Sequence, residues 1–528
     1  MPPTAAFPQK QKILHRKERI LPFRIFCKRN AQTCSVNKNQ KESPIALTGD
    51  TEKNISAIKS VLPAQDILVY RFKTACGTEC AAIYADGITD KELLGELVAK
   101  PLSLTPAPKT AEDAAALLYF PESKIVQDVN QICGEILSGN PALLIGGICE
   151  AVILGTKKIA VRAVTEPQTA VTVKGPREGF IEDVKTNMGL IRKRLKTPDL
   201  RFETMTVGRK SQTVVTIAYL QGIADEKVLE EIRTRISAVE IDGIPDSSYV
   251  GKFLAKKPYS LFKQIGTTEK PDILCAKMLE GRVAVLCDGS PIALTLPYML
   301  LEDFQSSQDY FVSPYRATIS RILRTLAVFI SLFLPALYIA AELFRLQLLP
   351  FGLLMTISSG VQDLPLSPSL ELFFLLIVLE VLIEASIRMP KYVALALSVI
   401  GALVLGDTAV KAGLVSSSAI IIVALSGISA YTVPDLTGTL SVIRLAFVVI
   451  AGSIGTYGII LFTALLFYYL VSSDGYGVPL LAPFTPLIRS DLRDSVFKTD
   501  IYALNKRPKV LKSKNETRLK VRYKEKNG

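Results

Sequence analysis

The sequence predicts a duplicated α/β soluble domain in the N-terminal part, followed by an all-α polytopic membrane domain. Short β-branched runs alternate with segments of helical period between residues 55 and 297. Residues 319–471 then run almost continuously apolar. The chain has 528 residues, of which 49% are hydrophobic, and a mean hydropathy of +0.31. It is therefore too long for one domain and too apolar for an ordinary cytosolic enzyme.

The net charge of +13 is concentrated towards both ends of the chain, over residues 10–41 and 498–526. Nucleic acid could explain this charge, but basic flanks beside membrane spans are more typical of the positive-inside rule and of contact with anionic lipid. We therefore expect membrane lipid and no nucleic acid as a partner. The expected parts are a basic, disordered tail over residues 1–50, α/β subdomains over 51–165 and 166–305, a membrane domain of four to six helices over 306–473, and a basic cytosolic C-terminal tail over 474–528.

The first 41 residues contain no apolar run long enough for a cleavable signal peptide. We therefore expect the large N-terminal domain to stay in the cytosol. Catalytic motifs are also missing from the sequence. The only histidine is His15, and no Walker A loop, nucleophile elbow or dinucleotide fingerprint occurs. The sequence therefore predicts no enzyme, no catalytic residues, no metal site and no cofactor.

The soluble region contains an internal repeat. Residues 82–97 align with residues 217–232, and residues 136–147 align with residues 278–289. The aligned positions in the first pair include Tyr84 with Tyr219, Gly87 with Gly222, Ile88 with Ile223, and Asp90 with Asp225. Each copy of that pair predicts a strand, a Gly-Ile turn and a helix capped by aspartate. We infer two similar α/β subdomains.

A motif in the stretch between the two repeats is a candidate subdomain junction. It consists of Gly175, Pro176, Arg177, Glu178 and Gly179, and a basic helix follows it. A Gly-Pro turn that leads into a helix N-terminus can hold an anion. The alternative is a turn and a solvated helix face that pack the two subdomains together.

The membrane region offers five candidate spans with about the length that a bilayer requires. They are residues 325–344, 369–387, 392–412, 414–433 and 445–471. The segment 346–359 is too short to cross. Basic flanks at both ends require an even number of crossings, whereas five candidates give an odd number. Either residues 392–433 contain an incomplete span or residues 346–359 contribute one.

Five charges in the apolar region form a candidate pore or intramembrane charge network: Glu380, Glu384, Arg388, Asp407 and Lys411. An ionisable side chain at membrane depth is costly, so it faces a protein interior or a wet pathway rather than lipid. The first three recur every four residues and share one helical face. One interpretation is that Glu384 pairs with Arg388 and Asp407 with Lys411 as static pins between helices. The other is that the carboxylates face a pore or a partner subunit.

Three glycines in the last candidate span, Gly452, Gly455 and Gly458, recur every three residues. On one continuous helix they would form a smooth face that lets a second helix approach closely. We therefore predict a helix contact at these glycines.

Several ordered motifs carry a family resemblance over roughly residues 55–498. They are Glu166-Pro-Gln-Thr, Gly175-Pro-Arg-Glu-Gly-Phe, Val207-Gly-Arg-Lys-Ser, Ile241-Asp-Gly-Ile, Asp288-Gly-Ser-Pro, and Glu380 and Glu384 with Arg388-Met-Pro. By these motifs the chain resembles the GerA family of bacterial spore germination proteins, and within it the A-subunit type. Asp407 departs from the pattern, because the family usually has glutamine there.

The resemblance implies the large subunit of a three-component nutrient germinant receptor in the spore inner membrane. Its partners would be a transporter-like B subunit and a lipoprotein C subunit. The resemblance also implies that A subunits form a homo-oligomer that conducts cations. Two alternatives stay open: a paralogous accessory subunit linked to the dipicolinate-release system, and a non-channel membrane scaffold whose soluble domain recruits partners.

Overall fold

The computed structural model describes residues 46–118, 120, 122–156, 175–348, 350–352, 354–355, 364–390, 393, 401, 406–500 and 504–518. Three predicted features lie wholly or largely outside these ranges: the basic N-terminal tail, the start of the stretch that joins the two repeats, and most of the candidate span 392–412. The segment 346–359 is described only in part.

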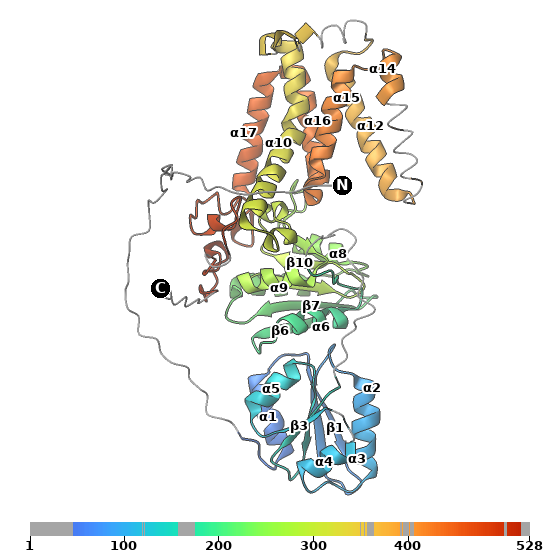
Figure 1. Cartoon of the computed structure of the whole chain (residues 1–528), viewed down its shortest axis with the longest axis vertical. Coiled ribbons are helices and arrows are strands. Elements are labelled where there is room, and N and C mark those ends of the chain that lie inside the picture. Colours follow the sequence, from blue (N-terminus) through green and yellow to red (C-terminus); the bar gives the residue numbers. More distant parts are fainter. Residues whose placement is uncertain are drawn as a thin grey trace, which may run out of the picture. The chain divides into compact units, whose positions relative to one another are not determined.

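The first subdomain is an antiparallel five-stranded sheet in the order β1-β2-β4-β5-β3, with helices on both faces (Figure 1). Its elements are α1 (Thr51–Val61), β1 (Ile67–Lys73), β2 (Glu79–Ala85), α2 (Lys91–Leu93), the π-helical η1 (Leu94–Ala99), α3 (Lys100–Leu104), α4 (Ala111–Leu118), β3 (Ser123–Val126), α5 (Val129–Leu137), β4 (Ala142–Ile145) and β5 (Ala151–Leu154). Helices α1 and α5 bury one face of the sheet, and η1, α3 and α4 bury the other. Both strands β4 and β5 are buried along their whole length, as expected for a covered sheet.

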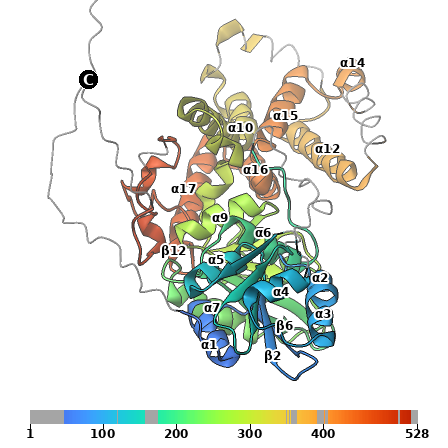
Figure 2. The same ribbon diagram turned by 60° about the horizontal axis from the view of Figure 1, so that its bottom comes forward.

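The second subdomain has the same construction. Its elements are α6 (Val184–Arg194), β6 (Leu200–Val207), β7 (Thr213–Leu220), α7 (Glu226–Ser237), α8 (Ser247–Leu254), β8 (Gly266–Thr268), α9 (Pro271–Glu280), β9 (Val283–Cys287) and β10 (Ala293–Leu296). The sheet order is β6-β7-β9-β10-β8. Helices α6 and α9 bury one face and α7 and α8 the other, and Figure 2 gives a second view of these helices.

The predicted duplication is confirmed, because the two strand orders are identical when the strands are counted within each subdomain. The aligned turn glycines also adopt equivalent backbone conformations. Gly87 has a φ of 82° and Gly222 a φ of 78°. This left-handed region favours glycine, which explains why both copies carry glycine at the same position.

A buried ion pair connects the two subdomains. Asp66, directly before β1, and Arg192 of α6 are each only 1% exposed, and Arg192 Nη2 lies 2.7 Å from Asp66 Oδ2. Arg192 Nε donates a second hydrogen bond to the same carboxylate over 3.1 Å. Beside this pair, the turn at Gly87 approaches α6 so closely that a Cβ on Gly87 would lie 2.4 Å from the carbonyl oxygen of Lys185. The contact between the two subdomains, called the joint below, therefore depends on Gly87 as well as on the ion pair between Asp66 and Arg192.

The membrane region contains five long helices among the residues that the structure describes (Figure 1). They are α10 (Pro314–Phe344), α12 (Pro368–Arg388), α15 (Ser417–Ala430), α16 (Thr437–Ile454) and α17 (Thr456–Ser472). Helix α10 and the run Pro434–Ile454 are long and apolar enough to cross a bilayer, while α15 and α17 are shorter apolar helices. Helix α12 has the length of a span but carries charged side chains.

The predicted single span over residues 445–471 is wrong. Helix α16 ends at Ile454, Gly455 has a φ of 68°, and α17 begins at Thr456. A residue in this conformation breaks the helix, and glycine adopts it without steric cost. The three glycines at 452, 455 and 458 therefore do not line one continuous helix face.

Contacts between the helices fix the direction in which each one runs. Thr439 near the start of α16 and Tyr469 near the end of α17 both hydrogen-bond the loop of subdomain 2 at Leu261. At the opposite end of the bundle, the turn at Gly455 packs against Phe344, the last residue of α10. Helices α10 and α16 therefore run away from subdomain 2, and α17 runs back.

Helices α12 and α15 also run back towards subdomain 2. Each begins at the far end of the bundle, where Glu371 in the first turn of α12 accepts a hydrogen bond from the backbone N–H of Ser416, the N-cap residue of α15. Helices α12 and α15 therefore run in the same direction.

Residues 474–500 and 504–518, which belong to the predicted basic C-terminal tail, fold against the rest of the chain. The hairpin of β11 (Asp474–Gly475) and β12 (Val478–Pro479) packs against subdomain 2. Tyr476 at its turn is buried in the core of that subdomain, and its hydroxyl donates to the carbonyl of Leu254 over 2.6 Å. Further along, Val510 and Leu511 join Met299 in a small apolar cluster. Apolar side chains spaced among the basic ones account for this folding.

The two turn glycines provide a test of the joint. We expect Gly222→Ala to cost about 1 kcal/mol of unfolding free energy, since the added Cβ meets only the unfavourable backbone conformation. Gly87→Ala should cost clearly more, because its Cβ would also collide with the backbone of α6. Urea unfolding of the detergent-solubilised chain measures both. Equal losses of unfolding free energy in the two variants would show that the close approach of Gly87 to α6 adds no further constraint on stability.

Candidate functional site

A buried arginine lies at the centre of the helix bundle. Arg444 of α16 is 1% exposed and places Nη2 2.6 Å from Oε1 of Glu380 on α12. Its Nη1 donates to Ser426 Oγ on α15 over 3.1 Å, and Ser426 in turn donates to the carbonyl of Ser331 on α10 over 2.8 Å. One guanidinium thus links four helices. Because an unpaired charge in such a place is costly, Glu380 and Ser426 are required neighbours.

Sequence reasoning missed Arg444, since the last span was predicted to begin one residue after it. A lone arginine at the edge of a long apolar run is the signal that could have revealed it. Glu380 was predicted as an intramembrane charge that shares a helical face with Glu384 and Arg388, and the structure places its partner on another helix.

The other four predicted charges form two ion pairs that stay within a single helical turn. Glu384 Oε1 lies 2.5 Å from Arg388 Nη2, with side chains 61% and 78% exposed. Asp407 Oδ2 lies 2.5 Å from Lys411 Nζ, and both side chains are also exposed. The pairing that the sequence suggested is therefore present, but neither pair bridges two helices among the described residues. Both pairs lie on the surface of the chain.

The three predicted glycines make different contacts. A Cβ on Gly452 would lie 2.8 Å from the Cβ of Ser369, so this glycine lets α16 approach α12. Gly455 forms the turn against the ring of Phe344. Gly458 follows that turn and lies beside Ile450. Close packing occurs at each position, but against three different neighbours.

The candidate subdomain-junction motif is held by charge. Glu178 pairs with Lys193 over 2.8 Å and with Arg194 over 2.6 Å, both from the last turn of α6. The hydrogen bond from Lys193 lowers the pKa of Glu178, and the contribution of Arg194 adds to it against the opposing effect of burial. Gly175, with a φ of 117°, would bring a Cβ to 2.6 Å from the ring of Phe311. Gly175 and Glu178 therefore contact the segment before α10 and helix α6 of subdomain 2.

The anion site that the motif could have formed is already filled by carboxylates of the chain. The backbone N–H of Thr186 donates to Asp183 over 2.7 Å. The backbone N–H of Val184 donates to Asp288 over 3.2 Å. With two negative side chains at the N-terminus of α6, a further anion would meet repulsion. The packing alternative is the one that the geometry supports.

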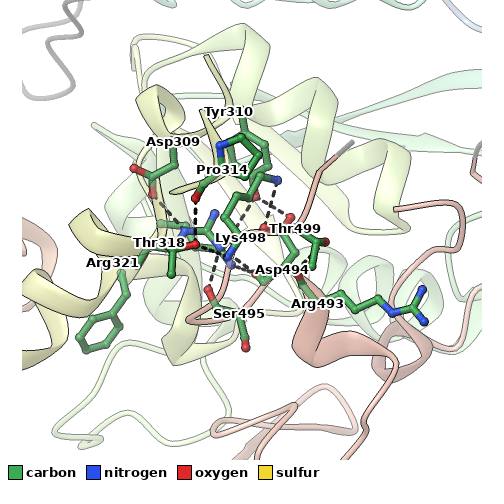
Figure 3. A network of polar contacts seen from close by, with 12 residues as sticks. Asp309, Tyr310, Pro314, Thr318, Arg321, Arg493, Asp494, Ser495, Lys498 and Thr499 are labelled. Atoms are coloured by element: carbon green, nitrogen blue, oxygen red, sulfur yellow. Dashed lines mark hydrogen bonds and ion pairs between the residues drawn. The ribbon is translucent and has the colours of Figure 1, made fainter. Parts of the chain in front are cut away.

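A second polar network joins the segment just before α10, the start of α10 and the C-terminal segment (Figure 3). Arg321 of α10, 1% exposed, places Nε 3.1 Å from Asp309 and Nη1 3.0 Å from Asp494. It also donates to the carbonyl of Ser495 over 2.7 Å. Burial opposes ionisation of Asp309, but hydrogen bonds from Arg324 and the charge of that side chain outweigh it and lower the pKa of Asp309. The network therefore holds a charged carboxylate under α10.

The loop before α10 makes a third junction, close to the start of α16. Lys263 Nζ lies 2.8 Å from Asp303 and 3.5 Å from Asp435. The hydroxyl of Tyr298 donates to Asp303 over 2.6 Å. Burial raises the pKa of Asp303 to about 6, even though Lys263 acts in the opposite direction. Asp303 is therefore a carboxyl group that titrates near neutral pH at the base of the helix bundle.

Within the described ranges, no group of three or more His, Cys, Asp or Glu side chains is arranged to hold a metal ion. The sites described above consist of ion pairs, hydroxyl groups and close glycine contacts. Such groups can hold helices in position, and the ion pairs among them can change when a nearby charge changes. The sites described above offer no nucleophile paired with a general base.

The fold defines a membrane protein with a duplicated α/β soluble domain. The model of the Bacillus/Clostridium GerA spore germination protein family matches residues 55–510. The chain belongs to this family, so the resemblance found in the sequence motifs is confirmed. The family is one of germination proteins and not of enzymes.

Individual relatives match over most of the chain. Spore germination protein KA of Bacillus subtilis (strain 168) is 33% identical over 490 residues, which cover 91% of this chain and 90% of the relative. Spore germination protein A1 of the same organism is 32% identical, with 88% of this chain and 96% of the relative covered. The uncharacterized membrane protein YfkQ, also from that organism, is 32% identical over 84% of this chain and 87% of its own length.

One solved structure covers the soluble part. The crystal structure of the N-terminal domain of the A subunit of the Bacillus megaterium spore germinant receptor GerK3 is 27% identical. It covers 48% of this chain and 98% of that chain, with a TM-score of 0.38.

The Arg444–Glu380 pair yields a prediction about assembly. Glu380→Gln should cost about 3–5 kcal/mol of stability, since it leaves a buried guanidinium without its counter-charge. A second change, Arg444→Gln, should restore most of the loss, because removing both partners leaves no uncompensated charge. Thermal unfolding of the purified chain and its yield in membranes measure both effects.

The matched control is Glu384→Gln, which breaks an exposed pair on the same helix and should cost less than about 1 kcal/mol. Equal losses for the Glu380 and Glu384 variants, or no rescue by the second change, would contradict a structural role for the buried pair.

Asp303 yields a prediction about pH. Its pKa rises from an ordinary value of 3.8 to about 6 on folding, so between these values the folded state binds more protons than the unfolded state. The contribution of Asp303 to stability should therefore be fully present below about pH 4 and should be lost, by about 2–3 kcal/mol, as pH rises through 6. Asp303→Asn should abolish this part of the pH dependence, measured by unfolding at a series of pH values. Asp242→Asn, at an exposed position, should leave it unchanged, and an unaltered profile in the Asp303 variant would refute the assignment.

Proposed function

We propose that this chain is the A subunit of a nutrient germinant receptor in the inner membrane of a bacterial spore. In this role it works with a transporter-like B subunit and a lipoprotein C subunit, and its soluble domain lies in the cytosol. Nutrient detection leads to germination when A subunits, assembled as a homo-oligomer, conduct cations. Membership of the GerA family supports the role in germination.

The observation that carries the channel proposal is the exposure of two ion pairs on apolar helices. Glu384 with Arg388, and Asp407 with Lys411, lie on the surface of the chain within its most apolar region. Lipid is a poor environment for such pairs, whereas a water-filled pathway or a neighbouring subunit is a good one. Carboxylates that repeat around an oligomer form acidic rings, which concentrate cations at a pore.

The helix bundle also exposes much apolar surface. Side chains that are 60–70% exposed include Ile421, Ile428, Ile460, Leu461 and Leu465. Such a surface needs lipid or a protein partner around it. Charged and apolar surfaces occur on the same bundle, which fits a subunit that contacts lipid on one side and other subunits around a pathway on another.

The contacts also supply a route from the soluble domain to the bundle. The loop at Leu261 accepts a hydrogen bond from Thr439 in the first turn of α16. Helix α16 carries Arg444, whose partner Glu380 belongs to α12, the helix that also carries Glu384. A displacement of the loop can therefore move the helices that bear the exposed charges.

The channel proposal predicts that the double change Glu384→Gln with Asp407→Asn reduces nutrient-triggered cation release at least several-fold, because it removes carboxylates from the pathway. Release of potassium and sodium from spores that carry the variant, at matched levels of the chain in the membrane, measures this effect.

The control is Glu96→Gln, which removes one partner of an equally spaced and exposed pair with Lys100 in the soluble domain. This change should leave ion release unaltered. Normal ion release from a well-assembled double variant would rule out these carboxylates as pore residues and favour a scaffold, or a pore lined by other side chains.

A further inference from the structure

A chain of polar side chains crosses the far end of the bundle. The hydroxyl of Tyr338 on α10 lies 2.9 Å from Ser418 Oγ on α15. Ser418 donates to Ser416 Oγ over 3.2 Å, and the backbone N–H of Ser416 donates to Glu371 Oε1 on α12 over 2.5 Å. Three helices thus bring three hydroxyl groups and one carboxylate together.

A second carboxylate belongs to the same cluster. Glu342, one turn after Tyr338, lies close enough to it for a side-chain hydrogen bond, and close enough to Glu371 for electrostatic repulsion. Among the described residues, no lysine or arginine forms an ion pair with either carboxylate. Glu371 is 1% exposed, and its second oxygen, Oε2, has no hydrogen-bond donor in the described part of the chain. One oxygen of Glu342, Oε2, is likewise without a donor there.

Helix dipoles compensate this charge only in part. Glu371 lies in the first turn of α12 and contacts the N-terminus of α15, where partial positive charge favours a carboxylate. Glu342 lies in the last turn of α10, where the dipole is negative and disfavours it. A buried carboxylate without a counter-charge costs several kcal/mol. A positive charge between Glu342 and Glu371 would therefore stabilise the cluster.

The oxygen atoms around this point define the kind of cation. Calcium takes six to eight oxygen ligands, and magnesium demands octahedral geometry and keeps several waters. The cluster offers two carboxylates, each with one oxygen engaged or shared, and neutral hydroxyl oxygens from Tyr338, Ser416 and Ser418. The three neutral hydroxyl oxygens are ligands of the kind that alkali-metal ions accept in selective cation pores, where neutral oxygens replace the hydration shell.

We propose that Glu342, Glu371, Tyr338 and Ser418 form a binding site for an alkali-metal cation at the far end of the helix bundle. The site's place on a conduction pathway rests on the proposed channel function, but cation binding itself does not. The site joins α10, α12 and α15, so an occupied site holds these three helices together. It differs from the exposed pairs at Glu384 and Asp407, which already carry their own counter-charges.

The test compares the unfolding temperature of the purified, detergent-solubilised chain in potassium chloride, sodium chloride and N-methyl-D-glucamine chloride at one ionic strength. The unmodified chain should unfold several degrees higher in at least one alkali-metal salt, because a ligand that binds only the folded state stabilises it. Glu371→Gln and Glu342→Gln should abolish that difference. Tyr338→Phe, which keeps the ring, should reduce it.

Glu96→Gln is the control, since it removes an exposed carboxylate of the soluble domain outside the site, and it should keep the full difference between salts. Equal unfolding temperatures in all three salts would overturn the proposal. So would stabilisation by calcium chloride alone, or stabilisation that follows only a fall in pH, which would identify a proton as the neutralising charge.

The outcome is independent of conduction. A channel that conducts while the unfolding temperature shows no preference for alkali-metal ions would overturn the site and leave the channel proposal intact. A clear preference in a chain that does not conduct would support the site and count against the channel.

Discussion

The buried arginine–carboxylate pair is the interaction on which this structure depends, and it recurs at three junctions. Arg192 pairs with Asp66 between the two soluble subdomains. Arg321 pairs with Asp309 and Asp494 where the segment before α10 and the C-terminal segment meet that helix, and Arg444 pairs with Glu380 inside the bundle. These arginines are the three largest side chains that are fully buried among the described residues.

Such pairs do more for geometry than for net stability. Desolvation of two charges cancels much of their attraction, so an apolar replacement of similar size would hold the parts together about as well. An apolar contact, however, tolerates sliding, whereas a guanidinium that shares several hydrogen bonds accepts one arrangement. We infer that the pairs fix how each part meets the next. A change that starts in one part is then passed on as a movement of whole elements.

Local signals in the sequence predicted the repeat because each of them has a local physical cause. Gly87 and Gly222 occupy turns that need positive φ, and the following aspartates cap the next helix. The features that sequence reasoning missed depend on tertiary contacts. In the sequence, Gly455 is one of three evenly spaced glycines in an apolar run. The helix break occurs there, and its packing on Phe344 distinguishes it from the other two. Tyr476 lies in a short glycine-containing turn after α17, and its partner Leu254 is far away in the sequence.

The charges of the candidate site also divide into those that local spacing predicts and those that depend on tertiary contacts. Spacing along one helix predicted that Glu384 and Arg388 would lie together, since residues four apart face the same side. Spacing could not predict that Glu380, one turn earlier, belongs to an arginine on α16, nor that Glu371 meets the N-terminus of α15. Both contacts arise where separate helices pack, and they are buried, whereas the locally predictable pairs are exposed. The pair that can be predicted from the sequence, Glu384 with Arg388, is therefore an exposed one that is available to solvent or a partner. The contacts of Glu380 and Glu371, which cannot be predicted in this way, are the ones that hold the helices of the bundle together.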